Sequence, residues 1–245
     1  ALRGVAEVVI VVDGSTDGTA EWLRTQADSR LTVCEQDRSG SPAARQRGIA
    51  VSSGDWVLLA DDDCLQAPDH VEILRAEAER TGADIVGAPW LHVVDPRAAA
   101  DYARGAPRIE RPGLHTLPYV FPRATVRTPF LIAGGGILVR RRVLEAIRFD
   151  PGYRVNAWRE ETDFVLQANA AGFTSLLTPA TYMHQAGDFG GGHERSRLSY
   201  EWWTAVNNWR FLRRHAAELR RRREIRPVVL EQLATWRRRK RQLLT

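Results

Sequence analysis

The chain has 245 residues, of which 44% are hydrophobic and 27% charged, and a net charge of +5, values typical of a globular protein with one large domain. No apolar run approaches the length that a bilayer requires, and no secretory signal peptide is visible. Two cysteines, Cys34 and Cys64, are too few for a disulfide scaffold, so a reducing, cytoplasmic compartment is expected.

The first part of the chain predicts a unit of strand, loop and helix. Residues 7–12 form a β-branched run typical of a buried strand, and turn-forming residues at 13–19 lead into a helix at 19–26. Asp13 follows the strand directly. Its carboxylate could accept a hydrogen bond from a nucleobase or a sugar hydroxyl, or it could only brace the turn together with Ser15.

The alternation of strand and helix continues to residue 88, which predicts a mostly parallel sheet with helices on its faces. The next elements are expected in the order strand, helix, strand, helix, strand, at residues 31–35, 43–51, 56–60, 68–80 and 83–88. Arg45 lies near the start of the first of these helices. From there its guanidinium could reach a phosphate or a base.

Three consecutive carboxylates, Asp61, Asp62 and Asp63, follow the apolar strand at residues 56–60. Open α/β sheets bind their ligands at the carboxyl ends of the strands, which is where this acidic cluster is expected. Adjacent negative charges repel one another and carboxylate oxygens suit Mg²⁺ or Mn²⁺, so the cluster predicts a divalent metal site. The simpler alternative is a solvated acidic turn in front of the next helix.

A second group of candidate residues follows a long segment, residues 95–130, that shows no clear periodicity. Glycines 134–136 interrupt an apolar run, which permits close approach of the backbone to another group. Glu160 and Glu161 open a predicted helix, where one could act as a general base or both could simply favour the helix dipole. His184 follows a short extended segment and on its own is typical of an ordinary polar residue.

The C-terminal part of the chain is predicted to be helical and is strongly basic. The remaining elements are expected as helices at 140–147, 158–171, 196–220 and 225–243 and a strand at 175–178. Residues 210–245 hold 13 basic and 3 acidic residues, a balance of +10, so the rest of the chain carries −5. Such a segment suits an anionic surface, so a peripheral membrane contact is one hypothesis and a solvated Arg-rich helix is the other.

Taken in order, these motifs resemble those of a family 2 glycosyltransferase with the GT-A fold. The resemblance covers roughly residues 7–215 and rests on the stretches VVIVVDGSTDGT, GSPAARQRGI, SGDWVLLADDDCLQAPD, GGGILVRRRVLEAIRFD, EETDFVLQANAAGF and YMHQ. It implies an α/β fold with a Rossmann-like, mostly parallel sheet flanked by helices. It also implies inverting transfer of a sugar from a nucleotide-sugar, with UDP as the default nucleotide and Mn²⁺ or Mg²⁺ as the metal.

The resemblance implies roles for the residues of the nucleotide-binding half. Asp13 matches the position that binds the base, and Arg45 lies in the stretch that helps to hold the nucleotide. Asp63 matches the metal ligand of the DxD motif, and Asp61 or Asp62 would contact the ribose or complete the metal shell.

The resemblance also implies roles for the candidate residues of the second half of the chain. The three glycines, of which Gly135 and Gly136 are the central candidates, match the loop that lines the donor-sugar and acceptor site. Glu160-Glu161 stands where the family usually has Glu-Asp with the second residue as general base, so Glu161 is the expected base and Glu160 its neighbour. His184 matches a histidine that completes the metal shell in many members.

The expected domain organisation follows from the same resemblance to the family. Residues 1–195 are assigned to the glycosyltransferase domain, with a nucleotide-binding part at 1–94 and an acceptor and catalytic part at 95–195. Residues 196–245 are expected to form a helical extension rich in Arg and Trp, with an interfacial membrane location as a hypothesis. The family usually has a further strand and helix ahead of residues 7–12, so the first strand of the fold is expected to be absent from this sequence.

Three other functions fit parts of the sequence. A non-catalytic, glycosyltransferase-like module would bind nucleotide without turnover. A sugar nucleotidylyltransferase shares the topology, but its Gly-rich N-terminal phosphate loop is not found. A nucleic-acid binder driven by the C-terminal arginines would not explain the acidic residues, and no nucleic-acid partner is expected. The acceptor is left open among a glycan, a lipid carrier, a natural product and a protein.

Overall fold

The computed structural model describes residues 2–91, 108–109, 121–129, 136–185, 197–223, 225–226 and 229. For five residues it describes the backbone alone: Leu91, Ile109, His184, Gln185 and Arg197. Most of segment 95–130, two of the three candidate glycines and most of the helix expected at 225–243 therefore lie outside the described residues.

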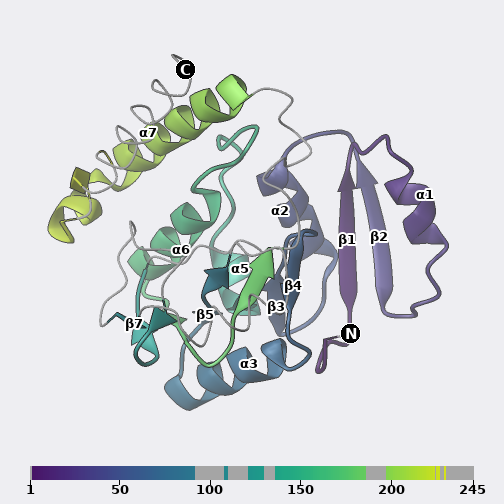
Figure 1. The fold of residues 1–245 in the computed structure, drawn as a ribbon, viewed down its shortest axis with the longest axis horizontal. Coiled ribbons are helices and arrows are strands. Elements are labelled where there is room, and N and C mark those ends of the chain that lie inside the picture. The colour runs from purple at the N-terminus through teal and green to yellow at the C-terminus, as the bar shows by residue number, and fades with distance from the viewer. Residues whose placement is uncertain are drawn as a thin grey trace, which may run out of the picture.

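The described chain forms an α/β fold, as predicted (Figure 1). Its helices are α1 (Thr19–Arg24), α2 (Ser41–Val51), α3 (His70–Thr81), α5 (Arg141–Ala146), α6 (Glu160–Ala170) and α7 (Arg197–Arg221). Its longer strands are β1 (Val8–Asp13), β2 (Leu31–Gln36), β3 (Trp56–Leu59) and β10 (Ile137–Arg140). The shorter strands are β4 (Cys64–Gln66), β5 (Ile85–Gly87), β6 (Trp90–Leu91), β7 (Arg108–Ile109), β8 (Phe121–Pro122), β9 (Val126–Arg127), β11 (Ser175–Leu177) and β12 (Met183–Gln185).

The central sheet has five strands in the order β3-β10-β5-β11-β9. β11 runs parallel to β5, whereas β10 runs antiparallel to both β3 and β5, so the sheet is mixed and not mostly parallel. The glycine-interrupted apolar run ends in β10, whose backbone direction the periodicity of the sequence could not reveal. A second sheet, β4-β12-β6, carries the segment that follows the three aspartates.

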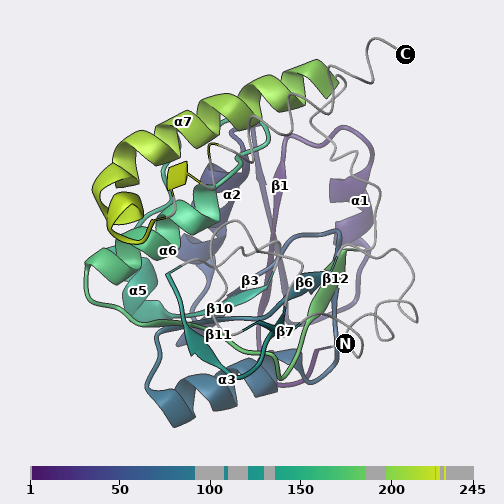
Figure 2. The same cartoon turned by 60° about the vertical axis from the view of Figure 1, so that its left-hand side comes forward.

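Side chains of the central sheet alternate between its two faces, as the pleat of a strand requires. In β5, Ile85 joins the larger buried cluster and Val86 the smaller one. In β10, Val139 belongs to the larger cluster and Leu138 to the smaller one. Figure 2 shows α3 against one side of this sheet and α5, α6 and α7 on the other. The sheet is therefore the middle layer between two helical layers.

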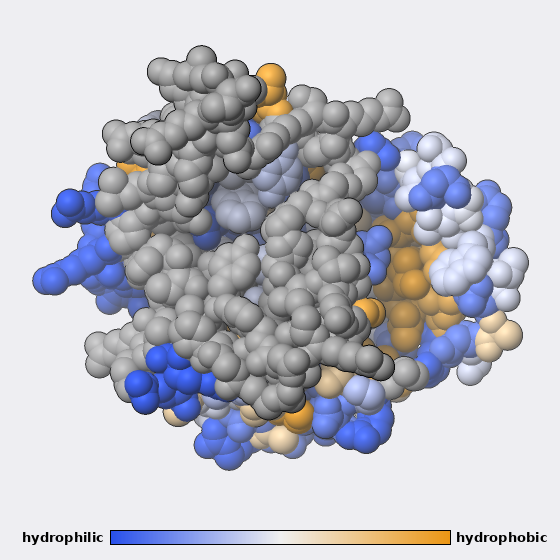
Figure 3. Space-filling model, in the orientation of Figure 1, coloured by the Kyte–Doolittle hydropathy of each residue, from blue (hydrophilic) through white to orange (hydrophobic). Residues whose placement is uncertain are grey.

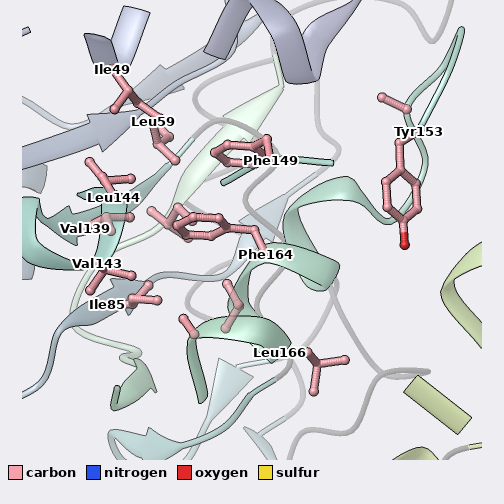
Figure 4. Close-up of a cluster of buried hydrophobic side chains, with 14 of the residues drawn as sticks. Ile49, Leu59, Ile85, Val139, Val143, Leu144, Phe149, Tyr153, Phe164 and Leu166 are labelled. Atoms are coloured by element: carbon pink, nitrogen blue, oxygen red, sulfur yellow. The ribbon is translucent and has the colours of Figure 1, made fainter. Parts of the chain in front are cut away.

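The larger cluster fixes α6, the helix that begins with Glu160. In Figure 4 the rings of Phe149 and Phe164 lie face to face between α6 and the sheet, with centroids 4.5 Å apart and an interplanar angle of 5°. Phe211 and Leu219 of α7 belong to the same buried cluster. The 25-residue helix α7 therefore packs on the same core as α6.

β1 and β2 form a separate two-stranded parallel sheet. β3 lies at the end of the central sheet and pairs with β10, so β1 and β3 do not pair with each other. α1 covers the β1–β2 sheet through a small cluster of Val12, Ala20 and Leu23. The first four residues of β1 are only half-buried, and Figure 3 shows apolar atoms gathered over β1 and β2.

Candidate active site

The predicted acidic cluster lies at the end of β3. This strand ends at Leu59, and Asp61, Asp62 and Asp63 form the turn that leads directly into β4. The amide of Cys64 lies 3.4 Å from the carbonyl oxygen of Asp61, which closes the turn. Asp61 and Asp63 are half-buried and Asp62 is exposed, so two of the three carboxylates face the body of the protein.

One side chain, Arg45, joins this turn to the start of α6. Its Nη2 donates to Asp61 Oδ1 and to Glu161 Oε1, at 2.6 Å in each case. Its Nε lies 3.2 Å from Glu160 Oε1 and 3.2 Å from the hydroxyl of Ser41. The Arg45 side chain is only 10% exposed. The acidic turn and the distant start of α6 therefore converge on one guanidinium of α2.

The helical period explains why α2 can supply two groups to this site. Ser41 and Arg45 are four residues apart, so they lie on the same face of the helix. The Ser41 hydroxyl donates to Glu160 Oε1 at 2.5 Å. The Arg45 guanidinium also lies 5.9 Å from the centroid of the Phe149 ring, which belongs to the core under α6. α2 is thereby tied both to the carboxylates and to the packing that holds them.

The site holds more negative charge than its arginine neutralises. Burial disfavours the charged guanidinium, but Glu161, Asp61 and Glu160 together raise the pKa of Arg45, so it stays protonated. Burial raises the pKa of Asp61 and that of Glu160, and Arg45 opposes both shifts. Among the described residues, none bonds the buried Oε2 of Glu160. Three carboxylates around one cation leave room for a further cation or a proton.

The segment before α6 has an unusual backbone. Three non-glycine residues have positive φ angles: Val155 (60°), Ala157 (46°) and Arg159 (75°). Such conformations cost on the order of 1–3 kcal/mol each and persist only where the surroundings hold them. Two asparagines of α7 supply that support. Asn207 Nδ2 donates to the Arg154 carbonyl at 2.9 Å, and Arg159 Nε donates to Asn208 Oδ1 at 3.1 Å.

Asp163, one turn into α6, is fully buried and contacts α7. Its Oδ1 lies 2.6 Å from His215 Nε2, and its Oδ2 accepts a hydrogen bond from Gln167 at 2.6 Å. Arg214 Nη1 lies 3.5 Å from the same carboxylate. Asp163 therefore points away from the acidic turn and helps to fix the position of α6 against α7.

Asp13 lies at the end of β1, where the sequence places it, and braces the loop after β2. Its Oδ1 accepts hydrogen bonds from the Gln36 amide group and the Ser39 backbone, both at 2.8 Å. Its Oδ2 accepts from the Gly40 backbone at 2.7 Å. Asp13 thus braces a loop, as one of the two alternatives held, but the loop is the one at residues 36–40 and not its own turn with Ser15. A role of Asp13 toward a nucleobase stays a prediction.

The acidic turn also contains the potential metal ligands. Ligand atoms of Asp61, Asp63 and Cys64 lie within 4.8 Å of one another. Burial and the neighbouring Asp63 raise the pKa of the Cys64 thiol, which disfavours the thiolate that a metal would need. Carboxylate oxygens are the ligands that Mg²⁺ and Mn²⁺ prefer, so the two aspartates fit such an ion and the cysteine does not.

His184 lies close to this turn in the backbone. It pairs with Leu65 in the antiparallel ladder of β12 and β4, two residues after Asp63. Its side chain is outside what the structure describes, so its metal role stays a prediction. Of the candidate glycines, Gly135 lies outside the described residues and Gly136 immediately precedes β10. A Cβ on Gly136 would lie 2.5 Å from Met183 Sδ, so a side chain here would require the buried Met183 to move.

Two polar residues near the site were not singled out in the sequence. Ser41 bonds Glu160, and its position four residues before Arg45 is the only sequence signal that could have found it. His70 is fully buried in the first turn of α3, with Nδ1 3.0 Å from the hydroxyl of Thr181. Its Nε2 has no hydrogen-bond partner among the described groups. Nothing in its sequence neighbourhood distinguishes it from an exposed helix residue.

Comparison with known proteins identifies the family. The family model described as glycosyl transferase family 2 matches residues 3–148, more than half of the chain and the part that contains Arg45 and the three aspartates. The chain belongs to glycosyltransferase family 2. The assignment that the sequence motifs suggested is thus confirmed, and with it the α/β fold class.

Curated relatives of this family 2 chain include three bacterial proteins. Glycosyltransferase GlyA of Streptococcus pneumoniae is 29% identical over 151 residues, covering 60% of this chain and 22% of the relative. Succinoglycan biosynthesis protein ExoO of Rhizobium meliloti is 29% identical over 170 residues, covering 67% and 47%. Undecaprenyl-phosphate 4-deoxy-4-formamido-L-arabinose transferase of Pseudomonas fluorescens is 38% identical over 90 residues, covering 35% and 26%. The matches thus span less than half the length of each of these relatives.

Two solved structures share the fold. S. aureus TarS (residues 1–349) has a TM-score of 0.53 at 15% identity, covering 87% of this chain and 64% of that one. GalNAc-T7, solved with UDP, GalNAc and Mn²⁺, has a TM-score of 0.57 at 18% identity, covering 76% and 38%. These similarities concern the fold.

None of the described helices is long and apolar enough to cross a bilayer.

Proposed function

We propose that this family 2 chain transfers a sugar from a nucleotide-sugar to an acceptor hydroxyl in a single displacement with inversion at the anomeric carbon. The observation that carries the proposal is the position of Arg45, whose Nη2 contacts both Asp61 of the acidic turn and Glu161 of α6. Through this contact, Asp61, proposed to bind the donor, and Glu161, proposed as the base, lie on either side of one guanidinium, from where both could face the same bound sugar.

The donor side of the site is assigned to the ends of β1 and β3 and to α2. Asp13 and Arg45 would hold the nucleotide, and Asp62, the exposed member of the acidic turn, would contact the ribose. Gly135 and Gly136 are assigned to the lining of the donor-sugar site, as the family resemblance implies. UDP is the proposed nucleotide, by analogy with the UDP with which GalNAc-T7 was solved.

Asp61 and Asp63 would hold a divalent ion, Mn²⁺ or Mg²⁺, with His184 as a further ligand. When bound, such an ion neutralises the negative charge that develops on a departing diphosphate. The chain's own contribution is to keep these carboxylates close together and half-buried. Arg45 orients Asp61 through the 2.6 Å contact and remains positively charged beside it.

On the acceptor side, Glu161 is proposed as the general base that takes the proton from the attacking hydroxyl. The 2.6 Å contact with Arg45 holds the Glu161 carboxylate in a fixed position at the start of α6. Glu160 is more deeply buried, with a side chain 6% exposed against 13% for Glu161. Glu160 is therefore proposed to orient Ser41 and Arg45, with Glu161 facing the reacting atoms.

The remaining assignments belong to the same proposal. Residues 1–94 form the nucleotide-binding part, 95–195 the acceptor and catalytic part, and 196–245 a basic helical extension. The acceptor is proposed to be a glycan or a lipid-linked hydroxyl, in a cytoplasmic location with peripheral membrane contact.

The first experiment is calorimetric titration with UDP, GDP and dTDP, each with and without Mn²⁺, on the chain and on an Asp63→Ala variant. We expect metal-dependent binding of one nucleotide, lost in the variant. A coupled assay for nucleotide release would follow, with UDP-sugars and a panel of glycan and lipid acceptors. Binding without release in any combination would favour the non-catalytic module, and no binding at all would contradict the proposal.

A further inference from the structure

α7 has an inner face that packs on the core and an outer face that does not. On the inner face, Asn207, Asn208, Phe211 and Leu219 are buried. Figures 1 and 2 show α7 along the edge of the molecule, with α6 beneath it. The helix has 25 residues, which corresponds to a length of about 37 Å. Its outer face is thus a long exposed surface.

That outer face carries large apolar side chains. The exposed fractions are 67% for Leu198, 67% for Trp202, 36% for Val206 and 63% for Trp209. These residues follow one another at spacings of four, four and three, which places them in one stripe along the helix. We call these four residues the α7 ridge. The other exposed large hydrophobic residues of the described chain are scattered: Trp22, Val51, Leu65 and Val229.

The same stripe continues toward the end of the helix with positive charge. Arg213 follows the ridge four residues after Trp209, and Arg220 lies seven residues further on, so both share its face. Both arginines are exposed. Arg221 to Arg223 are also exposed at the helix end. The outer face of α7 therefore combines two tryptophans with a group of arginines.

No carboxylate shares this face among the described residues of α7. Glu201 lies about 100° around the helix from Trp202 and is half-buried, and Glu218 lies nearly opposite the ridge. Glu218 is also bound by Arg221 and Arg222, at 2.7 Å and 2.5 Å. The charge on the outer face is thus entirely positive, and a complementary surface would be negative.

We propose that the α7 ridge docks on an anionic lipid bilayer, with the helix lying in the plane of the interface. Tryptophan rings and aliphatic side chains favour the boundary between headgroups and acyl chains, and arginines favour the phosphates above it. The ridge is a narrow apolar stripe with basic residues at one end, which is the pattern of interfacial helices and not of spanning ones. The proposed surface lies in α7, within the extension at 196–245 for which the sequence suggested an interfacial location.

This inference deepens the peripheral membrane contact of the proposed function by naming the surface that makes it, and docking would occur whichever sugar is transferred. Docking would nevertheless fix the orientation of the catalytic site. The inner face of α7 holds the backbone that leads into Glu160, through Asn207 and Asn208. A bilayer on the outer face would then lie one helix away from the proposed acceptor side.

The test is co-sedimentation of the full chain with vesicles, without donor or acceptor, so that its outcome is independent of transferase activity. Vesicles of phosphatidylcholine and phosphatidylglycerol are compared with vesicles of phosphatidylcholine alone. The variants are the pair Trp202→Ala/Trp209→Ala and the pair Arg213→Gln/Arg220→Gln. Matched controls are Trp22→Ala, a similarly exposed tryptophan on α1, and Arg75→Gln, an exposed arginine on α3. Circular dichroism and thermal melting verify that each variant is folded.

We expect the wild-type chain to sediment with anionic vesicles and much less with neutral ones. The tryptophan pair should lower the partition coefficient by at least about tenfold, since two large apolar side chains leave the interface. The arginine pair should lower it by about fivefold per residue on anionic vesicles, and both controls should match the wild type. Equal sedimentation of the folded tryptophan pair and the wild type would overturn the proposal. It would equally be overturned if light scattering showed a lipid-free dimer that the tryptophan pair dissociates, because the ridge would then bind a second copy.

Discussion

Arg45 Nη2 lies 2.6 Å from Glu161 Oε1, although the two residues are 116 positions apart in the chain. The same nitrogen contacts Asp61, and Nε of the same side chain contacts Glu160. A planar guanidinium presents several donors in fixed directions, which a flexible ammonium cannot reproduce. Arg45 therefore sets the relative positions of α2, the acidic turn and α6, besides contributing charge.

The first prediction concerns the stability that this arginine provides. Arg45→Ala would leave three partly buried carboxylates without their cation, and breaking a buried ion pair costs about 3–5 kcal/mol. Arg45→Lys should recover only part of the loss, because a single ammonium nitrogen cannot occupy the positions of both Nη2 and Nε. Urea denaturation followed by circular dichroism measures both effects.

The matched control is Arg75→Ala. Arg75 pairs with Glu79 on the exposed surface of α3, where its side chain is 59% exposed, and such pairs contribute at most about 1 kcal/mol. If Arg45→Ala and Arg75→Ala lowered the free energy of unfolding equally, the central role assigned to Arg45 would be wrong.

The second prediction separates the two neighbouring glutamates. Glu161→Gln should lower kcat by a factor of about 10²–10⁴, since an amide cannot act as a general base, and should leave nucleotide affinity nearly unchanged. Glu160→Gln should reduce kcat much less, because its amide oxygen can still accept the Ser41 hydrogen bond. Steady-state kinetics and nucleotide titration of both variants provide the measurement. A larger loss of kcat in Glu160→Gln would transfer the role of base to that residue.

The third prediction concerns the metal ligands. Asp61→Asn and Asp63→Asn should each weaken Mn²⁺ binding by more than about tenfold, whereas Cys64→Ser should leave it unchanged. The reason is that the buried Cys64 thiol has a raised pKa and stays protonated, so it is a poor ligand for an ion that prefers oxygen. Electron paramagnetic resonance of free Mn²⁺ reports the bound fraction directly. Loss of binding in Cys64→Ser with retention in Asp63→Asn would indicate a thiolate site and contradict the assignment.

The sequence could predict those parts of the fold and site that depend on local pattern. The step from an apolar run to three aspartates marks the end of β3 because both signals lie within a few neighbouring residues. The acidic start of α6 is visible for the same reason. These features were placed correctly, with element ends differing by one or two residues.

The parts that depend on contacts between distant segments could not be predicted in the same way. The contact of Arg45 with Glu161 joins two helices, and no periodicity in either helix encodes it. The antiparallel direction of β10 depends on which strands it inserts between, β3 and β5, and not on its own residues. The support of α7 for the strained backbone before α6 has the same origin, since Asn207 and Asn208 look like ordinary surface residues in the sequence.

The last prediction concerns the pH dependence of stability and follows from His70. Burial lowers the pKa of this imidazole to about 4, with a smaller opposing effect of Asp69, whereas the unfolded chain has a pKa near the ordinary value of 6.5. Between these values the unfolded state binds the proton and the folded state does not. The contribution of His70 is therefore fully present above about pH 6.5 and is lost as the pH falls toward 4, to an extent of about 3 kcal/mol.

The variant His70→Gln isolates this contribution because it removes the titrating imidazole. The carboxylates and the other histidines titrate alike in the wild type and the variant. The difference in the free energy of unfolding between wild type and variant should change across pH 7 to 4.5, with the wild type losing stability faster on acidification. Urea denaturation at a series of pH values gives this difference. A difference that stays constant over the range would mean that the His70 imidazole is protonated equally easily in the folded and unfolded states, in conflict with its complete burial beside Thr181.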